Sequence, residues 1–347
     1  MTARLLTTAD ADAWNEALPP ERSAFGSLGF ARAQERAGVA QHRLLAAENG
    51  DARVAYPLQL RPLAELPFQT DLASGVWDAA SPPFTGPLAA GDLAGATGPL
   101  ADEIAGLLAD EGVVAEFAHL HPWNGQPELV GGAEPDREIV WVDTALDADA
   151  LWRESYSKAC RKNVNRAERE GVSVREARDA ADIAEFHRIY IETMERTEAL
   201  EAYFFDEAYF QAIFEELPAG ARFALAEHDD RVIAATLYLH DGDDVYSYLG
   251  GADHDHQQLR PTNAVVHETI RWAREEGKRR LILGGGYRPG DGIFRFKASF
   301  SPQRATLELA RRVHLPDDLE TLVAAWREHH GPGADPGGYF PPYRSAG

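Results

Sequence analysis

The spacing of apolar and polar residues predicts two mixed α/β units in this chain of 347 residues. In the first unit, residues 1–145, helical periodicity predicts three helices, over residues 9–18, 28–37 and 99–110. Strand-like patterns cover four runs, residues 43–48, 53–60, 113–117 and 138–143. Asn49-Gly50-Asp51 joins the first two of these strands as a hairpin signal. Residues 61–91 are rich in proline and glycine and are predicted to be loop.

The spacing of apolar and polar residues is more regular in the second unit, residues 146–312. It predicts helices over residues 151–169, 183–194 and 206–217, and a further helix that begins at Pro261. Predicted strands are residues 222–227, 232–239, 245–249, 281–283 and 306–310. Residues 232–239 are apolar on both faces, which indicates a central, buried strand. A C-terminal helix within residues 313–330 and a flexible tail, residues 331–347, complete a fold of the α/β class with mixed sheets.

One stretch of the second unit carries candidate chemistry. The strand 281–283 ends in Gly284-Gly285-Gly286, and glycines at a strand end let a ligand approach the backbone closely. Lys297 follows, one of four lysines among 34 basic residues. A lysine supplies a compact ammonium whose pKa shifts readily on burial. By itself the motif fits equally well a glycine-rich turn followed by a surface lysine.

Two further patterns suggest that the second unit binds an anion. The helix that begins at Pro261-Thr262-Asn263 presents free N–H groups and the positive end of its dipole. A basic stripe recurs at steps of three and four residues: Lys158, Arg161, Lys162, Asn165 and Arg169. A solvated helix face is the alternative interpretation of the stripe. Between the strands that end at Gly250 and Gly284, we expect a cleft in which an acyl carbonyl meets a nucleophile.

Composition narrows the class of protein. A net charge of −22, with 44% hydrophobic and 26% charged residues, is typical of a soluble globular protein and argues against broad binding to nucleic acid or anionic membranes. No apolar run is long enough to span a bilayer and the N-terminus does not resemble a signal peptide, so a cytoplasmic protein is expected. The single cysteine, Cys160, excludes an internal disulfide, and Asp253-His254-Asp255-His256 is predicted to be solvated rather than a metal site.

Three motifs in order cover much of the second unit: Ser157-Lys158-x-x-Arg161-x-Asn163-x-x-Arg166, Tyr246-x-Tyr248-x-Gly250-Gly251, and Phe294-x-Phe296-Lys297-x-Ser299-Phe300. Their order and spacing resemble the FemABX-like branch of the GNAT acyltransferase superfamily. Residues 1–145, with Pro83-Phe84-x-Gly86-Pro87, match the first GNAT-like half of such proteins more weakly. The resemblance implies two GNAT-like domains in tandem with a substrate groove between them.

The resemblance also implies a function. It predicts transfer of an acyl or aminoacyl group from acyl-CoA or aminoacyl-tRNA, as co-substrate, to an amine of a small molecule, peptide or glycan, with no tightly bound cofactor. Phe296 and Lys297 become the catalytic pair, with Lys297 stabilising negative charge. The expected substrate-binding residues are Lys158, Arg161, Arg166, Tyr248, Thr262, Asn263, Gly284, Gly285 and Gly286.

Three points stay open at this stage. The general base could be Glu268, Asp291 or a carboxylate of the acceptor. The long insertion that forms a coiled-coil arm in some Fem enzymes is missing, which bears on the use of tRNA. The alternative function is a non-catalytic GNAT-like module that binds an anionic glycan, a nucleotide or RNA.

Overall fold

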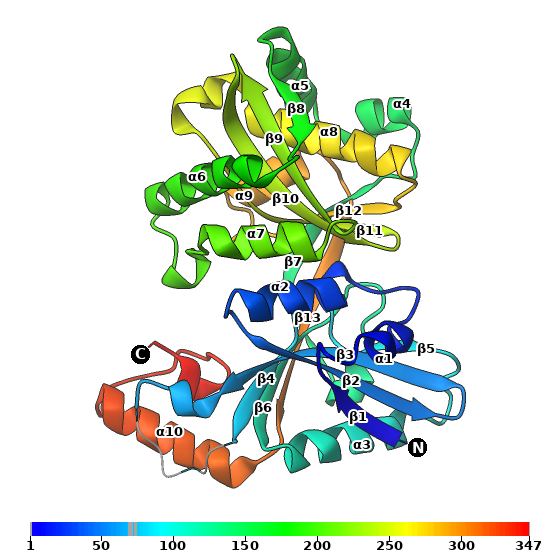
Figure 1. Ribbon diagram of the computed structural model, residues 1–347, viewed down its shortest axis with the longest axis vertical. Helices are drawn as coiled ribbons and strands as arrows, with labels where there is room; N and C mark the ends of the chain where they lie inside the picture. Colours follow the sequence, from blue (N-terminus) through cyan, green and yellow to red (C-terminus); the bar gives the residue numbers. More distant parts are fainter. Residues whose placement is uncertain (1, 69–71, 73–74, 347) are drawn as a thin grey trace. The chain divides into compact units, whose positions relative to one another are not determined.

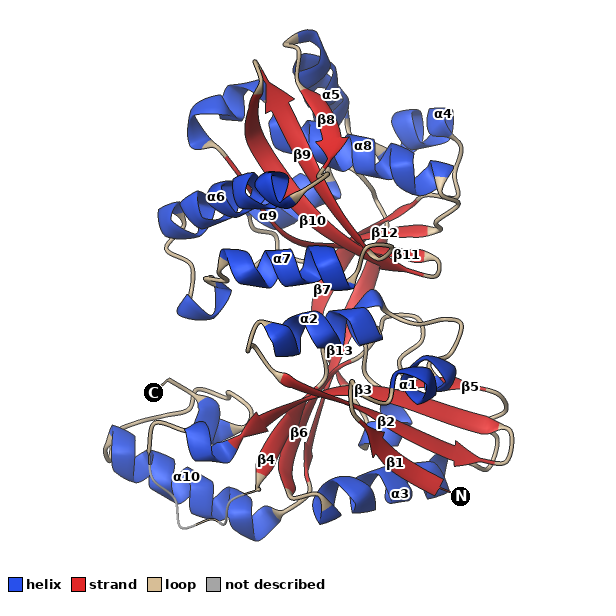
Figure 2. Ribbon diagram, in the orientation of Figure 1, coloured by secondary structure: helices blue, strands red, loops and turns tan. Residues whose placement is uncertain are grey.

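The computed structural model describes residues 2–68, 72 and 75–346, which form two compact units. Unit 1 combines residues 1–136 with residues 307–347, and unit 2 comprises residues 137–306. Figure 1 follows the chain through the elements of both units, and Figure 2 shows that each unit has helices packed around a sheet. The chain therefore leaves unit 1, forms the whole of unit 2 and returns.

Unit 1 is built on one sheet with the strand order β1-β2-β3-β4-β6-β13, and β5 pairs with β3. Only β4 and β6 run parallel among the described pairs of this sheet. The strands are β1 (Thr2–Leu6), β2 (Gln41–Asn49), β3 (Ala52–Pro62), β4 (Trp77–Ala80), β5 (Leu88–Ala90), β6 (Val113–His119) and β13 (Arg304–Val313). The helices are α1 (Ala11–Ala17), α2 (Leu28–Arg36), α3 (Thr97–Asp110) and α10 (Pro316–His330).

Unit 2 is built on a sheet with the strand order β7-β12-β11-β10-β9-β8, in which β11 and β12 form the parallel pair. The strands are β7 (Glu134–Asp143), β8 (Ser173–Glu176), β9 (Ala221–His228), β10 (Arg231–Asp241), β11 (Asp244–Ala252) and β12 (Arg280–Gly284). The helices are α4 (Ala148–Ala150), a π-helical turn (Leu151–Ser155), α5 (Lys158–Arg169), α6 (Ala180–Arg196), α7 (Glu207–Glu216), α8 (Pro261–Glu275) and α9 (Gly292–Ala298).

The two units repeat one order of elements. Starting from β1 in unit 1 and from β8 in unit 2, the order is a strand, two helices, a three-stranded antiparallel meander, a crossover helix and a strand parallel to the last strand of the meander. The crossover helix is α3 in unit 1 and α8 in unit 2. Each sheet is then closed by an antiparallel strand, β13 beside β6 and β7 beside β12. The predicted α/β class with mixed sheets is confirmed, and the chain contains two units with the same order of elements.

Amphipathic helices form the cores. On α3, Leu100, Ile104 and Leu108 are fully buried at four-residue steps and pack on the sheet of unit 1. On α8, Val266 and Ile270 do the same in unit 2. Strand β10 lies between β9 and β11 with most of its side chains buried, so the prediction of a central strand is confirmed. None of the described helices combines the length and apolar composition of a membrane span.

Two predictions for unit 1 were wrong. Residues 61–91, expected to be loop, contain β4 and β5; residues 69–71, 73 and 74 of this stretch lie outside the described residues. Strand β4 is only four residues long and lies among prolines and glycines, so no alternation of apolar and polar residues marks it in the sequence.

The C-terminal tail was expected to be flexible, but its described part, residues 331–346, is anchored to unit 1. Tyr343 is 1% exposed, and the Arg344 guanidinium contacts the buried Asp78 carboxylate at 2.8 Å.

Candidate active site

A cleft of about 550 Å³ opens in unit 2 where β11 and β12 diverge. The two strands pair in parallel only from Asp244 with Arg280 to Tyr246 with Ile282. Beyond that point β11 continues beside β10 to Ala252, whereas β12 ends at Gly284 beside Val140 of β7. The strand end of β11 (residues 247–252) and the loop after β12 (residues 285–287) form opposite walls. The cleft expected between these two strand ends is therefore present.

The lining of the cleft is cationic and aromatic. Three charged side chains line it, Arg137, Arg196 and Lys297, and among the described lining residues there is no aspartate, glutamate or histidine. The aromatic lining residues are Tyr190, Tyr203, Tyr248, Tyr287 and Phe296. In a chain with a net charge of −22, a cleft with three cations and no acid is suited to an anionic ligand.

The three consecutive glycines are explained by the packing of the protein itself. Gly284 has φ +79°, a left-handed conformation that favours glycine. A Cβ on Gly285 would lie 3.0 Å from the Glu138 carbonyl oxygen of β7, and a Cβ on Gly286 would lie 2.3 Å from Asp291 Oδ1. The sequence interpretation, that these glycines admit a ligand, is thus not needed to account for Gly285 and Gly286.

Asp291 holds the loop between β12 and α9 in place. Its carboxylate accepts hydrogen bonds from three backbone N–H groups, those of Phe294 (2.7 Å), Tyr287 (2.8 Å) and Arg288 (3.1 Å). It is the N-cap of α9, and these bonds hold the pKa of the carboxyl below its usual value. A carboxylate with its oxygens occupied and a lowered pKa is a poor general base, which counts against Asp291 in that role.

Lys297, on the last turn of α9, reaches back over the glycine run. Its Nζ donates a hydrogen bond of 2.7 Å to the Gly285 carbonyl oxygen, and a Cβ on Gly284 would lie 3.4 Å from it. Burial lowers the pKa of Lys297 to about 8, and the nearby negative charge of Asp291 limits this fall. The cleft thus contains a largely desolvated amine that still carries a proton in most molecules at neutral pH.

We expect Gly286→Ala to displace Asp291, because the added methyl group would overlap its carboxylate. Loss of this N-cap should lower the stability of unit 2 by about 1 kcal/mol and should slow acyl transfer by moving Lys297. Unfolding in urea and single-turnover rates measure the two effects. Gly292→Ala is the matched control: Gly292 is the first residue of α9, and a Cβ there would meet only Arg295 Nη2, at 3.9 Å. Equal behaviour of the two variants would contradict this account.

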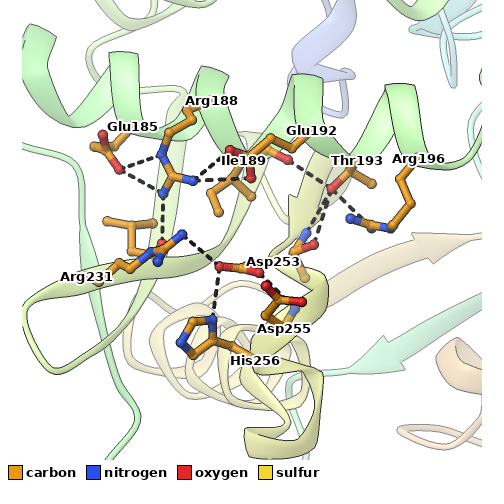
Figure 3. Close-up of polar contacts among 12 residues, drawn as sticks. Glu185, Arg188, Ile189, Glu192, Thr193, Arg196, Arg231, Asp253, Asp255 and His256 are labelled. Atoms are coloured by element: carbon orange, nitrogen blue, oxygen red, sulfur yellow. Dashed lines mark hydrogen bonds and ion pairs between the residues drawn. The ribbon is translucent and has the colours of Figure 1, made fainter.

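Helix α6 forms a further wall of the cleft and is fixed to the sheet by polar contacts (Figure 3). The Thr193 hydroxyl accepts a hydrogen bond of 3.1 Å from the Ala252 N–H at the end of β11. This close approach requires Gly251, whose Cβ would lie 2.3 Å from Thr193 Oγ1. Arg188 binds Glu185 and Glu192 on its own helix and donates to the Val232 carbonyl oxygen of β10 at 3.0 Å. These contacts place Thr193 and Arg196 beside the cleft.

The Asp253-His254-Asp255-His256 segment closes the turn after β11. Asp253 contacts Arg231 at 3.1 Å and His256 Nδ1 at 2.9 Å, and it accepts from the Asp255 N–H (Figure 3). Its carboxylate is thus used to hold the turn. Among the described residues no group of three or more histidines, cysteines and acids could hold a metal ion.

Six of the predicted site residues meet at the cleft: Tyr248, Thr262, Gly285, Gly286, Phe296 and Lys297. Gly284 lies beside Lys297 Nζ. Asn263, one residue into α8 from Thr262, is 5% exposed, and its side-chain nitrogen has no hydrogen-bond partner. The start of α8 therefore reaches the cleft through Thr262, as the sequence pattern suggests.

The predicted residues on α5 lie elsewhere, since none of them lines the cleft. Lys158 is exposed, and Arg166 is half-buried. Arg161 donates to the carbonyl oxygens of Trp152 (3.0 Å) and Arg153 (3.3 Å), so its guanidinium closes the preceding π-helical turn. Cys160, on the same helix, is buried, and burial raises the pKa of its thiol to about 12, which argues against a catalytic thiolate.

Sequence reasoning missed several residues that line the cleft, among them Arg137, Tyr190, Arg196, Tyr203 and Tyr287. They come from β7, from α6, from the connection between α6 and α7, and from the loop before α9. The aromatic run Tyr203-Phe204-Phe205 was visible, but its position opposite Tyr287 depends on how α6 packs on β11. A basic residue in the last turn of α6 is an ordinary feature of a helix end, so Arg196 carried no signal of its own.

The corresponding position in unit 1 is held closed. After the parallel pairing of β4 with β6, the Ser81 N–H donates to the Phe117 carbonyl oxygen at 2.9 Å, and the His119 N–H donates to Ser81 Oγ at 2.7 Å. A further parallel bridge joins Thr85 to Leu120. The two strands thus stay joined where β11 and β12 separate, and the candidate site belongs to unit 2.

Comparison with known proteins agrees with this placement. Residues 154–298 match the family model of the acetyltransferase (GNAT) domain. The crystal structure of FemX superposes with a TM-score of 0.71 at 14% identity, covering 92% of this chain and 99% of that one. L-PGS from Bacillus licheniformis has a TM-score of 0.54 at 13% identity, with 90% and 95% covered. The C-terminal DUF2156 domain assigned to a lysylphosphatidylglycerol synthetase of Agrobacterium fabrum gives 0.55 at 14%, with 92% and 96% covered.

At these identities the likeness to solved structures concerns the fold. A comparison with curated proteins by sequence finds no significant match. The resemblance to the FemABX-like branch of the GNAT superfamily is confirmed at the level of the fold, and the GNAT domain coincides with the unit that contains the cleft.

Proposed function

On the premise of a GNAT domain in a FemX-like fold, we propose that unit 2 transfers an acyl or aminoacyl group from an activated donor to an amine. The observation that carries the proposal is the position of Lys297. Its ammonium lies between two diverging strands in a cleft whose described lining includes no acidic residue, so it can face a developing negative charge there. The donor is an acyl-CoA or an aminoacyl-tRNA, which share an activated carbonyl and a phosphate-bearing carrier.

The proposed reaction is direct. The neutral amine of the acceptor attacks the carbonyl carbon, so that an N–C bond forms and the carbonyl oxygen becomes an oxyanion. Lys297, held by Gly285, stabilises this oxyanion through the remaining N–H groups of its ammonium. The C–S or C–O bond of the donor then breaks, and the proton of the amine leaves with the departing thiol or hydroxyl. Phe296 lines the cleft beside Lys297 and keeps water from the reacting carbonyl.

Neither protein carboxylate considered as a base suits the role. Glu268 lies on α8 and is paired with Arg271 at 3.0 Å, and it is not among the residues that line the cleft. Asp291 is occupied by backbone N–H groups. The cationic lining supports a different route, because it disfavours an ammonium ion and so promotes binding of the acceptor as the neutral amine.

Incubation with a donor and a mixture of primary amines tests the proposal. One arm uses acetyl-CoA and the other alanyl-tRNA, and mass spectrometry detects acylated amines. Product in one arm identifies the donor class. Binding of CoA or tRNA without any product in either arm would favour the non-catalytic module over the enzyme.

The lowered pKa of Lys297 can be measured without substrate. Because only four lysines occur in the chain, competitive acetylation with acetic anhydride followed by peptide mass spectrometry resolves each of them. We expect the labelling of Lys297 to rise with a midpoint near pH 8, since its neutral form is the nucleophile. Lys158, Lys162 and Lys278 serve as internal references. A midpoint for Lys297 above pH 10 would contradict the burial of this amine.

A further inference from the structure

The mouth of the cleft is unusually apolar for an exposed surface. Eight large hydrophobic residues of the described chain are exposed, and five of them lie in two short segments beside this cleft. These five are Leu200, Tyr203, Phe204, Tyr287 and Ile293. Tyr203, Tyr287 and Ile293 line the cleft directly. Clustering of this kind marks a surface that an apolar ligand covers, whereas scattered exposed residues do not.

Four tyrosines line the cleft: Tyr190, Tyr203, Tyr248 and Tyr287. Tyr190, although 1% exposed, donates from its hydroxyl to the Tyr203 carbonyl oxygen at 2.5 Å, and the Tyr209 and Tyr248 hydroxyls lie 2.9 Å apart. Burial raises the pKa of Tyr190, and the proximity of Tyr248, Tyr203 and Tyr287 adds to the rise. The buried hydroxyls thus bind one another or the backbone, and the rings present apolar surface to a ligand.

Two arginines, Arg196 and Arg137, line the same cleft as these tyrosines. Arg196 ends α6, is exposed, and donates a long hydrogen bond of 3.5 Å to the Thr193 hydroxyl. Arg137 packs its aliphatic stem against Gly285, with Cδ 3.4 Å from a Cβ placed there. Guanidinium groups match carboxylates in geometry as well as in charge. The described lining residues include no carboxylate that would form an ion pair with a polyamine or a second ammonium group.

We propose that the acceptor is an amine that also carries a carboxylate and a large apolar or aromatic group, of which a hydrophobic amino acid is the simplest example. This inference rests on the proposed function and names the substrate class of the same site. The carboxylate binds Arg196, the apolar group packs on Tyr203, Tyr287 and Ile293, and the amine faces Lys297. The N–C bond forms at that amine, and the donor's thiol or hydroxyl leaves with its proton.

A panel of four amines separates the features that the cleft recognises. L-Phenylalanine carries all of them, phenethylamine lacks the carboxylate, L-alanine lacks the aromatic group, and spermidine is a polycation. With acetyl-CoA or alanyl-tRNA as donor, we expect kcat/KM for L-phenylalanine to exceed the value for each of the others at least tenfold. Equal or better use of alanine, phenethylamine or spermidine would overturn the inference while leaving the proposed function intact.

Calorimetry of amine binding distinguishes failure of the proposed acyl transfer from failure of the proposed class of acceptor. If no amine gives product with either donor, the proposed function fails, and the dissociation constants of the four amines then decide the inference. Binding of L-phenylalanine at least tenfold tighter than that of phenethylamine and alanine supports it. Equal binding overturns it.

Two variants test separately whether Arg196 binds the carboxylate and whether Tyr287 packs on the apolar group of the acceptor. Arg196→Met should reduce the preference for phenylalanine over phenethylamine at least fivefold, and Tyr287→Ala should do so for phenylalanine over alanine. Arg271→Met and Tyr339→Ala replace exposed residues of the same types that do not line the cleft, and both ratios should stay unchanged. Melting temperatures establish that each variant is folded. Unchanged ratios in both cleft variants would contradict the proposed class of acceptor.

Discussion

Lys297→Met is expected to slow acyl transfer by about 100- to 1,000-fold, the usual effect of removing one group that stabilises an oxyanion. Methionine keeps the length and apolar stem of the side chain but supplies no charge and no hydrogen to donate. The loss should fall on the single-turnover rate, with little change in the binding of donor or acceptor. Rapid-quench kinetics with the donor identified above measures the rate, and calorimetry measures the affinities.

The same substitution should stabilise the fold at neutral pH. The folded pKa of Lys297, about 8, lies below its ordinary value of 10.5, so folding disfavours the charged form. The resulting penalty is complete below pH 8 and disappears as the pH rises toward 10.5. A shift of this size corresponds to at most about 3.4 kcal/mol, and partial exposure of the side chain reduces it to about 1–2 kcal/mol. Urea unfolding at pH 7 and pH 10 should show a gain that is lost at the higher pH.

Lys278→Met is the matched control for both measurements. Its Nζ also donates to a glycine carbonyl oxygen, that of Gly242 at 2.8 Å, but it does not line the cleft. We expect this variant to keep the wild-type rate. A Lys297→Met protein that is folded and still transfers at the wild-type rate would remove the oxyanion role. A rate lost only together with stability would instead indicate a structural role.

Local patterns predicted most of the cleft's backbone but few of its side-chain contacts. The meander, the start of α8 at Pro261 and the strand that ends at Gly284 each depend on residues close in sequence, and all were predicted. The cationic lining depends on α6 and β7 meeting the loop after β12, which no local pattern encodes. On α5 a local pattern gave a wrong expectation for a side chain. The regular spacing of basic residues predicted a face that binds an anion, whereas the Arg161 guanidinium donates to backbone carbonyl oxygens of its own unit.

The C-terminal tail illustrates the same limit in unit 1. Its composition, rich in glycine and proline, favours disorder, and nothing near Arg344 in sequence would attract its charge. The partner is Asp78, 0% exposed, which also binds Arg61. Arg344 in addition donates to the Pro62 carbonyl oxygen at 3.2 Å, and the Trp326 indole N–H donates to the Ser345 carbonyl oxygen at 2.9 Å. A contact over more than 260 residues of sequence makes the tail part of the core.

Deletion of residues 331–347 is therefore expected to destabilise unit 1 by about 5 kcal/mol. The deletion leaves the buried Asp78 carboxylate with Arg61 alone, which should cost about 3 kcal/mol. It also exposes the pocket that Tyr343 fills, which should cost about 2 kcal/mol. Urea unfolding followed by circular dichroism measures the midpoint. Arg344→Met in the full chain should reproduce the ion-pair part of the loss.

Removal of only Ala346 and Gly347 is the control, because Tyr343, Arg344 and Ser345 then remain. This shorter deletion should leave the unfolding midpoint unchanged. Combining Arg344→Met with Asp78→Asn should recover part of the lost stability, since the Oδ2 atom that Arg344 contacts is then replaced by part of a neutral amide. Equal midpoints for the long and short deletions would show that the tail contributes nothing to unit 1. A double variant less stable than Arg344→Met alone would mean that Arg61 suffices to neutralise Asp78.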